Sequence, residues 1–494
     1  MADEHVDADR WRRTVGLTLA CELTRYRVPV RIVDKAPQRT DKSKAIVLWS
    51  RTLELLDRGD QGSAPFVDAG FKVDGVNIVA PGGHVVGHVK MDSVSSPYRY
   101  ALMLPQSDTE RLLEERLQRL GVSVERSTGV TALKIGTDNV EATLRRADGS
   151  EETVQADWLA GCDGAHSIVR HTLAAPFSGE TMGGDWILAD VHMKGYLFPD
   201  TEVAVYWARE GVLPIFPISP GRYRIIANVA PSGEDHPRDA TLEEVQAIVE
   251  QRGPKGASLF DPIWLSSFRI NSRKVASYRL GRAFLSGDAA HVHSPAGGEG
   301  MNTGMQDAFN LAWKLALAVH GTCGEALLDT YSPERSRVGD EVLKATARLT
   351  AIGTLSNPIA EELRNIVGRV AFGLAPVQHA FADQLSQVSV GYPESPMNGP
   401  RHRSLHPAPG QRIAPIAGEP AFGAGNEPRF TLLASSSPAV ADLLASYPRL
   451  LNDTLGKPPT PDGVWLIRPD GYVAATASRA DLSGISDALR RLSA

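Results

Sequence analysis

The stretch GRAFLSGDAAHVHSPAGGEGMNTGMQDAFNLAWKLA, Gly281 to Ala316, carries the strongest structural signal in the chain. Its start, Ala283 to Ser286, has the pattern of a short buried strand. Gly287 and Asp288 follow at the carboxyl end of that strand, and a glycine-rich loop then leads into a helix from about Met301. Backbone N–H groups converge on an anion where such a loop meets a helix N-terminus. The stretch therefore predicts an α/β fold with a ligand site at this sheet edge.

Together with LLDTYSPER at Leu327 to Arg335, this stretch closely resembles the FAD-dependent aromatic-ring hydroxylases, single-component flavoprotein monooxygenases with the p-hydroxybenzoate hydroxylase fold. Within them it looks most like the branch of phenol hydroxylase and the aromatic polyketide hydroxylases. The resemblance implies FAD as the cofactor. It assigns FAD contacts to the GD motif (Gly287 and Asp288, the latter on the ribityl chain), to Pro295 along the flavin ring, and to the backbone at Gly300, Met301 and Asn302 along its pyrimidine edge.

A second string, LAGCDGAHSIVR, matches the family's DG motif, which serves both FAD and the nicotinamide nucleotide. Its matching residues are Asp163, Gly164, Ser167 and Arg170. A lone Asp-Gly is usually a turn. The DG and GD motifs in the family order, about 125 residues apart, are by contrast specific.

Two further segments extend the resemblance. Gln106 stands at the start of a helix for which Ser107 and Glu110 predict a capping box, and it matches the family glutamine near the flavin. SKAIVLWSRTLELL matches the segment where a basic residue meets the FAD pyrophosphate. Lys44 replaces the usual arginine there, which keeps the charge and loses the bidentate fork. Arg51 is a second candidate, with a solvated surface arginine as the alternative.

The chain departs from the family at its N-terminus. The family opens with a strand and G-x-G-x-x-G, whose glycines let the backbone approach the pyrophosphate. Here the third glycine alone is present, as Gly16 at the start of a predicted helix to Tyr26. A predicted strand, Val28 to Val33, follows, and Asp34 stands in the place of the acidic ribose ligand.

The residues ahead of Gly16, Ala8 to Thr14, are charged and bulky and predict neither a buried strand nor a phosphate loop. Read one base forward, their codons permit Leu-Ile-Val-Gly-Gly-Gly-Pro, and the single codon of Trp11 forces one of these glycines. Joined to Val15, this reading restores the motif. We therefore hypothesise a compensating pair of frame changes near Ala8 and Val15, by sequencing error or mutation. A genuine loss would instead weaken FAD binding and leave an inactive, flavin-poor relative.

The expected architecture has three units. The resemblance implies a discontinuous Rossmann-like FAD-binding domain (1–175 and 276–390), an inserted α+β substrate domain (176–275), a linker (391–415) and a thioredoxin-like domain (416–494). Strand-rich stretches between about 185 and 275 favour a sheet in the second unit. The C-terminal unit has no cysteine, which excludes dithiol exchange, so packing or a dimer contact is its expected use.

Composition excludes several classes of function. With 52 basic and 58 acidic residues the net charge is −6, whereas a protein that binds nucleic acid through phosphate contacts is normally basic. Three widely separated cysteines predict neither a disulfide framework nor a zinc site, and His291 and His293 have no third metal ligand nearby. The chain has no apolar run long enough for a membrane span and no apolar signal core. A cytoplasmic monomer or homodimer without a metal is expected.

The resemblance also implies a reaction. NADPH or NADH would reduce FAD, O₂ would add to form a flavin hydroperoxide, and one oxygen would pass to a phenolic or polyketide-type aromatic ring. Baeyer–Villiger insertion on the same scaffold is an alternative. The substrate is expected between the flavin and the sheet of the middle domain. Candidate lining residues are Tyr206, Pro214, Phe216 and Arg224, with a purely structural role as the alternative for each, and no catalytic base can be assigned.

Overall fold

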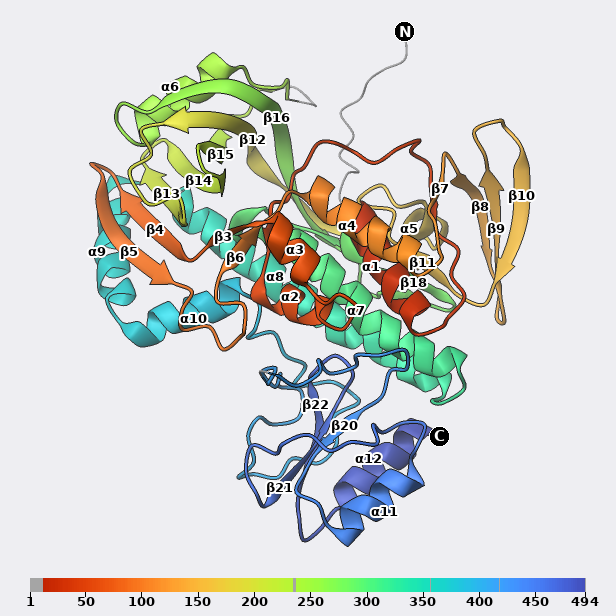
Figure 1. The fold of residues 1–494 in the computed structure, drawn as a ribbon. Coiled ribbons are helices and arrows are strands. Elements are labelled where there is room, and N and C mark those ends of the chain that lie inside the picture. The colour runs from red at the N-terminus through yellow and green to blue at the C-terminus, as the bar shows by residue number, and fades with distance from the viewer. Residues whose placement is uncertain (1–11, 234–236, 356, 417, 494) are drawn as a thin grey trace.

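The computed structural model describes residues 12–233, 237–355, 357–416 and 418–493, and Ala8 to Trp11 of the proposed frame change lie outside them. Figure 1 shows three units: an α/β unit in the middle, a large sheet beside it, and a small α/β unit formed by the C-terminal residues below both. No helix of the described residues is long and apolar enough to cross a membrane.

The central α/β unit is built on a parallel sheet that is split in two. Its helices are α1 (Arg12–Arg25), α2 (Ser50–Leu56), α3 (Ala64–Ala69), α4 (Gln106–Arg119), α5 (Ile168–Thr172), α7 (Gly300–Val319) and α8 (Tyr331–Gly353). One piece of the sheet pairs β1 (Val33–Asp34) with β7 (Glu125–Arg126) in parallel. The other has the order β11 (Leu159–Gly161), β18 (Ala283–Leu285), β17 (Arg279–Leu280), with β11 and β18 parallel.

The split falls where the family's first strand belongs. Helix α1 begins over the interval between the two pieces. A Cβ on Gly16 would stand 3.4 Å from Cys162 Cβ, just after β11, and 4.0 Å from Ile32 Cδ1, just before β1. Among the described residues no strand lies between β1 and β11. The predicted strand Val28 to Val33 accordingly shrinks to β1, which has a ladder partner on one side.

Smaller sheets and turns complete this unit. The predicted β-meander forms from β8 (Gly129–Ile135), β9 (Val140–Arg145) and β10 (Glu151–Ala156), all antiparallel. A second small sheet has the order β2 (Val47–Leu48), β6 (Ala101–Met103), β3 (Phe71–Val73). Three 3₁₀ turns lie at Gly287–Ala289, Ala296–Gly298 and Glu325–Thr330. The expected capping box fails: α4 begins at Gln106 behind Pro105, and Glu110 accepts from Gln106 Nε2 instead.

An eight-stranded sheet forms the second unit. Its order is β19-β16-β12-β15-β14-β13-β4-β5, with β19 (His291–Val292), β16 (Ser258–Lys274), β12 (Ser178–Lys194), β15 (Arg222–Val229), β14 (Gly211–Ser219), β13 (Glu202–Ala208), β4 (Gly75–Ala80) and β5 (His84–Lys90). Strands β4 and β5 come from the stretch that the sequence assigns to the FAD-binding domain, so this sheet extends beyond residues 176–275. Helix α6 (Leu242–Arg252) packs Val245 and Val249 against one face.

Helices α9 (Pro358–Phe372) and α10 (Ala375–Leu385) follow α8 and lie beside β5. The stretch 391–415, expected to be a linker, contains no helix or named strand but is well packed: Tyr392, Met397, Leu405 and Ile413 are buried. The C-terminal unit has the antiparallel order β20 (Thr431–Leu433), β21 (Gly463–Ile467), β22 (Val473–Ser478), with α11 (Pro438–Ser446) and α12 (Ser483–Ser493). Its thioredoxin-like character stays a prediction.

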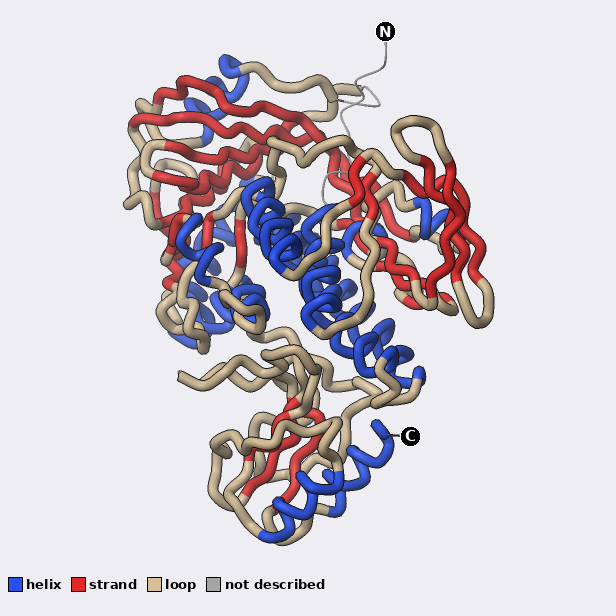
Figure 2. The backbone as a smooth tube through the Cα atoms, turned by 45° about the vertical axis from the view of Figure 1, so that its right-hand side comes forward, coloured by secondary structure: helices blue, strands red, loops and turns tan. Residues whose placement is uncertain are grey.

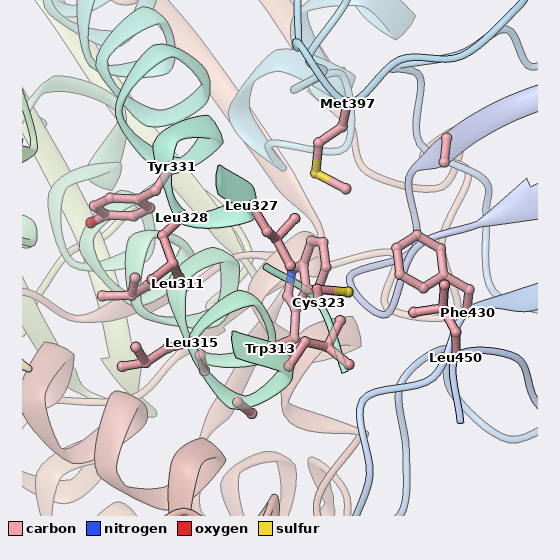
Figure 3. Packing of buried hydrophobic residues seen from close by; sticks show 14 of the residues in the cluster. Leu311, Trp313, Leu315, Cys323, Leu327, Leu328, Tyr331, Met397, Phe430 and Leu450 are labelled. Atoms are coloured by element: carbon pink, nitrogen blue, oxygen red, sulfur yellow. The ribbon is translucent and has the colours of Figure 1, made fainter. Parts of the chain in front are cut away.

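One hydrophobic core joins the C-terminal unit to the central unit. In Figure 3, Phe430 and Leu450 face Trp313 of α7, with Met397 and Leu327 alongside. The rings of Trp313 and Phe430 meet edge to face, 5.7 Å between centroids. The unit is therefore packed firmly against α7 rather than tethered by a free chain.

A buried ion cluster reinforces this junction. Arg468 places Nη1 and Nη2 at 2.7 and 2.9 Å from the two Glu334 oxygens, and Lys314 Nζ stands 2.7 Å from Glu334 Oε2. All three side chains have no exposed surface. Burial acts to raise the pKa of Glu334, but Arg468 and Lys314 outweigh it and hold that pKa well below its usual range. The cluster ties α7, α8 and the C-terminal unit together through charge.

Candidate flavin and substrate site

The GD motif lies on a tight turn against the start of α1. Gly287 has a left-handed φ of 59°, and a Cβ there would meet Val15 Cγ2 at 2.8 Å. A Cβ on Gly304 of α7 would meet the same methyl group at 2.7 Å. The turn is held by the buried Asp307 carboxylate, which accepts from Gly287 N at 3.0 Å and pairs with Arg335 at 2.6 Å. Asp288, half-buried on this turn, sits at the carboxyl end of β18 as predicted from the sequence.

The glycine loop after the motif delivers the N-terminus of α7 to the sheet edge. Gly297 and Gly298 adopt left-handed φ values of 80° and 64°, which other residues rarely take. Helix α7 then starts at Gly300, with the half-buried Pro295 at the head of the loop. First-turn N–H groups have no acceptor inside a helix, so those of Gly300 and Met301 are available to an anionic ligand edge.

The side chain of Asn302 fastens this loop to the strand β2. Its Oδ1 accepts from Trp49 N at 2.9 Å, and its Nδ2 donates to Val47 O at 2.8 Å and to Gly298 O at 3.1 Å. Trp49 Nε1 completes the link by donating to Gly297 O at 3.0 Å. The resemblance drew attention to the backbone of Asn302, and this role of its fully buried side chain went unnoticed.

A strap, residues 43–45, connects the loop region to the large sheet. Arg224 of β15 is fully buried; it pairs with Asp190 at 2.6 Å and donates from Nη1 to Lys44 O at 2.6 Å. The backbone N–H of Gln106 donates to Ala45 O at 2.9 Å from the other side. Lys44 extends over the Phe268 ring, 5.8 Å from its centroid. Arg224 therefore holds the strap, and with it Lys44, in position. The hydrogen bonds of its guanidinium go to Asp190 and to the strap backbone.

The sheet face toward the strap is aromatic. Phe216, Trp207, Trp264 and Phe268 lie on it and are half-buried. Because side chains alternate along a strand, Pro214 shares this face with Phe216 on β14. Three of the four predicted substrate-lining residues, Pro214, Phe216 and Arg224, thus face the strap side.

Tyr206 does not, and its assignment to the substrate is wrong. It packs with Val245 and Val249 of α6 on the opposite face of the sheet. Its buried hydroxyl has no hydrogen-bond partner among the described residues, and burial raises its pKa to about 12. Its neighbour Trp207 takes the position expected for Tyr206. Side chains alternate between the two faces of β13, but the sequence does not show whether Tyr206 or Trp207 lies on the face toward the site.

The DG motif packs against the GD motif. The Asp163 carboxylate accepts from Ser167 Oγ and, at 2.7 Å, from Ile168 N, so it caps α5. Gly164 turns the chain with a φ of 82°. Arg170 donates to Ala289 O at 3.2 Å, which fixes the spacing of the two motifs. The motif thereby shapes the site wall through backbone contacts.

At the other end of the expected FAD site, the Asp34 carboxylate forms ion pairs with two arginines. Arg13 of α1 stands 2.9 Å from its Oδ2, and Arg126 stands 2.7 Å from the same oxygen. Arg51 is also engaged elsewhere: it is buried, pairs with Glu54 at 3.0 Å and donates to the Asp470 carbonyl of the C-terminal unit. It is therefore neither a surface arginine nor open to a pyrophosphate.

Burial strongly raises the pKa values of two glutamates in the site region. Desolvation raises the pKa of Glu299, in the glycine loop, to about 8. Burial raises the pKa of Glu110 to about 7, against the opposing effect of the hydrogen bond from Gln106. Near neutral pH Glu299 is thereby held largely protonated, whereas Glu110 is close to its midpoint of titration.

The residues present fit one half of FAD. At the flavin-ring end they supply a loop with two left-handed glycines, the first-turn N–H groups of α7 and an aromatic sheet face. At the phosphate end the described residues supply neither the first strand nor the two leading glycines, and Arg13 covers Asp34. The described part of the chain therefore offers no glycine loop to a diphosphate at this end.

Known proteins share this architecture. Residues 14–346 match the family described as FAD binding domain. The chain is 34% identical to 6-methylpretetramide 4-monooxygenase of Streptomyces rimosus over 520 aligned residues, 97% of this chain and 92% of the relative. The anhydrotetracycline hydroxylase of Streptomyces rimosus superposes with a TM-score of 0.79 at 30% identity over 97% of both chains.

A second similar structure is described as a Diels–Alderase in the biosynthetic pathway of pyrroindomycins. Its TM-score is 0.75 at 27% identity, again over 97% of both chains. The fold therefore hosts more than one reaction, and the family rests on the sequence match and on the GD and DG motifs as placed above. The chain belongs to the FAD binding domain family of flavin-dependent monooxygenases, which includes aromatic polyketide hydroxylases.

Proposed function

We propose that this protein hydroxylates a phenolic or polyketide-type aromatic substrate with FAD, NADPH or NADH, and O₂. One observation carries the proposal: Trp49, which Asn302 links to the start of α7, belongs to the same hydrophobic cluster as Phe216 of the aromatic sheet face. That pairing brings an anion-stabilising helix end and a flat aromatic-binding surface to the same place.

The side chains and backbone have distinct tasks in this proposal. Bound FAD supplies the redox chemistry that activates O₂ with electrons from the nicotinamide. The N–H groups of Gly300 and Met301 stabilise negative charge at the flavin edge. Phe216 and Trp207 hold the substrate ring and exclude water from it. Arg224 positions the strap and thereby Lys44.

The FAD-binding residues that we propose are those of the flavin-ring end together with the nearby motif residues. They are Lys44, Gln106, Asp163, Gly164, Gly287, Asp288, Pro295, Gly300, Met301 and Asn302. Gly16 and Asp34 join them when the first strand and its glycine loop are restored by the frame correction. In the present sequence Arg13 pairs with Asp34, so we expect FAD binding to be weak.

The test is a spectrum followed by a product assay. Purified protein with added FAD should show the flavin bands near roughly 375 and 450 nm. With NADPH or NADH and a panel of phenols and polycyclic quinones, a substrate should gain one oxygen from ¹⁸O₂ with its rings intact. Ring opening would indicate Baeyer–Villiger insertion instead. Absence of the bands, both in this chain and in one carrying the restored motif, would overturn the proposal.

The altered phosphate end supports a second candidate: a flavin-poor protein that binds an aromatic metabolite without oxidising it. The Diels–Alderase neighbour shows that this fold is also found in a protein named for a reaction other than hydroxylation. This candidate predicts ligand-dependent quenching of tryptophan fluorescence in protein free of FAD, with no NADPH or NADH oxidation at any FAD concentration.

A further inference from the structure

Helix α9 exposes more apolar surface than it buries. The side packed on the protein carries the buried Glu361, Arg364 and Gly368, and Phe372 packs on the core at the last position of the helix. Arg364 places its guanidinium 4.7 Å from the centroid of the Trp207 ring. Soluble proteins normally bury the apolar stripe of a surface helix and expose the polar one. A helix that does the opposite is expected to have another partner.

The outward side of α9 is an apolar stripe. It consists of side chains that are 55–65% exposed: Leu363, Ile366, Val367, Val370 and, just after the helix, Leu374. Their spacing of three, four and seven residues places them along one line of the helix. Figure 1 shows α9 at the outer left edge of the molecule beside β5, and Figure 2 shows helices, in blue, at the same edge. Exposed apolar patches of this kind mark interaction sites.

The charges beside the stripe identify the partner. If Leu363 takes position a of a heptad, Ile366 takes d, and Glu362 and Arg369 both take g. Both flanking side chains are exposed. In an antiparallel pair of identical helices, flanking g residues face each other across the two-fold axis. With Leu363 opposite Ile366 of the second copy, Glu362 meets Arg369 of that copy, and the reverse contact forms by symmetry.

We propose that α9 is the centre of a homodimer interface in which two copies pair antiparallel through this stripe. The arrangement is isologous, because the same patch serves both chains and each chain supplies the cation for the other's anion. In a parallel pair of identical helices, g residues face e residues, which here are apolar, so the two charges would not pair. The five side chains offer about 500 Å² per copy, below the roughly 800 Å² of a standard interface, so the dimer should be of moderate strength.

The experiment is sedimentation or light-scattering mass over a dilution series of the full chain. The expected mass at high concentration is twice 53.2 kDa, falling to one chain on dilution. Ile366→Lys should abolish the dimer. Leu197→Lys is the matched control, since Leu197 is 64% exposed on another surface, and it should leave the mass unchanged.

A charge exchange tests the register without adding charge to the apolar stripe. Glu362→Arg alone and Arg369→Glu alone should each weaken dimerisation about tenfold, and the double variant should restore it. A monomer at every concentration would overturn the proposal, as would single and double variants that dimerise equally well. Loss of the dimer in Leu197→Lys would place the interface elsewhere.

Discussion

The two ends of the flavin site differ in how completely they are built. At the ring end, two left-handed glycines, the start of α7 and the Asn302 side chain form a continuous scaffold joined to β2. At the phosphate end, the sheet is split between β1 and β11 and an arginine covers the acidic residue. The sequence Ala8 to Thr14 departs from the family pattern at the phosphate end, while the residues that we propose to meet the flavin ring match it. The two halves of the proposed cofactor site thus rest on separate segments of the chain, and one can change while the other stays.

The largest effect should come from restoring the missing strand. Replacing Ala8 to Thr14 by Leu-Ile-Val-Gly-Gly-Gly-Pro should tighten FAD binding about 1,000-fold, roughly 4 kcal/mol. The three apolar residues would fill the interval between β1 and β11, and the glycines would offer N–H groups to the diphosphate. Titration followed by flavin fluorescence measures the change.

The control for that experiment is the replacement Leu-Ile-Val-Ala-Ala-Ala-Pro, which supplies the strand and obstructs the loop. It should recover little of the gain. If the unmodified chain already binds FAD as tightly as the restored one, the contrast between the two ends is wrong.

The next effect concerns Glu299 at the ring end. Burial raises its folded pKa to about 8, so the folded protein keeps a proton that the unfolded chain releases above its ordinary value of 4.5. The stability contributed by this group is therefore full at low pH and is lost as pH rises toward 8. Glu299→Gln removes that loss. The free energy of unfolding of the variant, relative to that of the parent, should therefore rise by about 3 kcal/mol between pH 5 and pH 8.

Urea unfolding at several pH values measures this difference. The matched variant Glu419→Gln changes an exposed glutamate in a turn and should show no such trend. A constant offset between Glu299→Gln and the parent across this range would show that the carboxyl is not held protonated.

A smaller effect on stability is expected where helix α7 packs against the start of α1, at Gly304 and Val15. Gly304→Ala places a Cβ 2.7 Å from Val15 Cγ2 and should destabilise by about 2 kcal/mol. The same change in a Val15→Ala background should cost less, because the contact with the Val15 methyl group is removed and the 3.2 Å contact with Gly287 Cα remains. Gly368→Ala, a helical glycine whose Cβ would find ordinary contacts, should be neutral or stabilising by about 1 kcal/mol. Thermal unfolding reads all four variants, and an equal cost of Gly304→Ala in both backgrounds would contradict the packing described.

The smallest effect is expected from the arginine on Asp34. Arg13→Ala should change FAD affinity less than threefold, because Arg126 still pairs with Asp34 and the strand is still missing. The same fluorescence titration applies, with the exposed Arg145→Ala as control. A gain near that of the restored strand would mean that the cation, and not the missing backbone, obstructs the phosphate end.

The sequence predicted the secondary structure between Ala283 and Met301 correctly because its signals are local. A buried strand, a Gly-Asp turn, a glycine loop and a helix start follow one another between Ala283 and Met301, and each constrains the next. The departure at Gly16 was visible for the same reason. Its structural result, a β1 reduced to two residues, follows from the loss of a ladder partner.

The wrong predictions concern two properties that a local stretch of sequence does not show: contacts between distant residues, and which face of a strand points toward the site. Arg51 was a reasonable pyrophosphate ligand until residue 470, far along the chain, proved to be its partner. Tyr206 was placed on the substrate side because alternation gives two faces without saying which is which. Recruitment of β4 and β5 into the large sheet likewise depends on parallel pairing of β4 with β13, which no local pattern encodes.

The buried cluster of Glu334, Lys314 and Arg468 makes the central unit depend on the C-terminal unit for its stability. A chain ending before this unit would leave Glu334 without its arginine beside an apolar surface once covered by Phe430. Breaking a buried ion pair in this way costs roughly 3–5 kcal/mol, a large share of the stability of most domains. A gene shortened to the first two units is therefore a poor choice for expression.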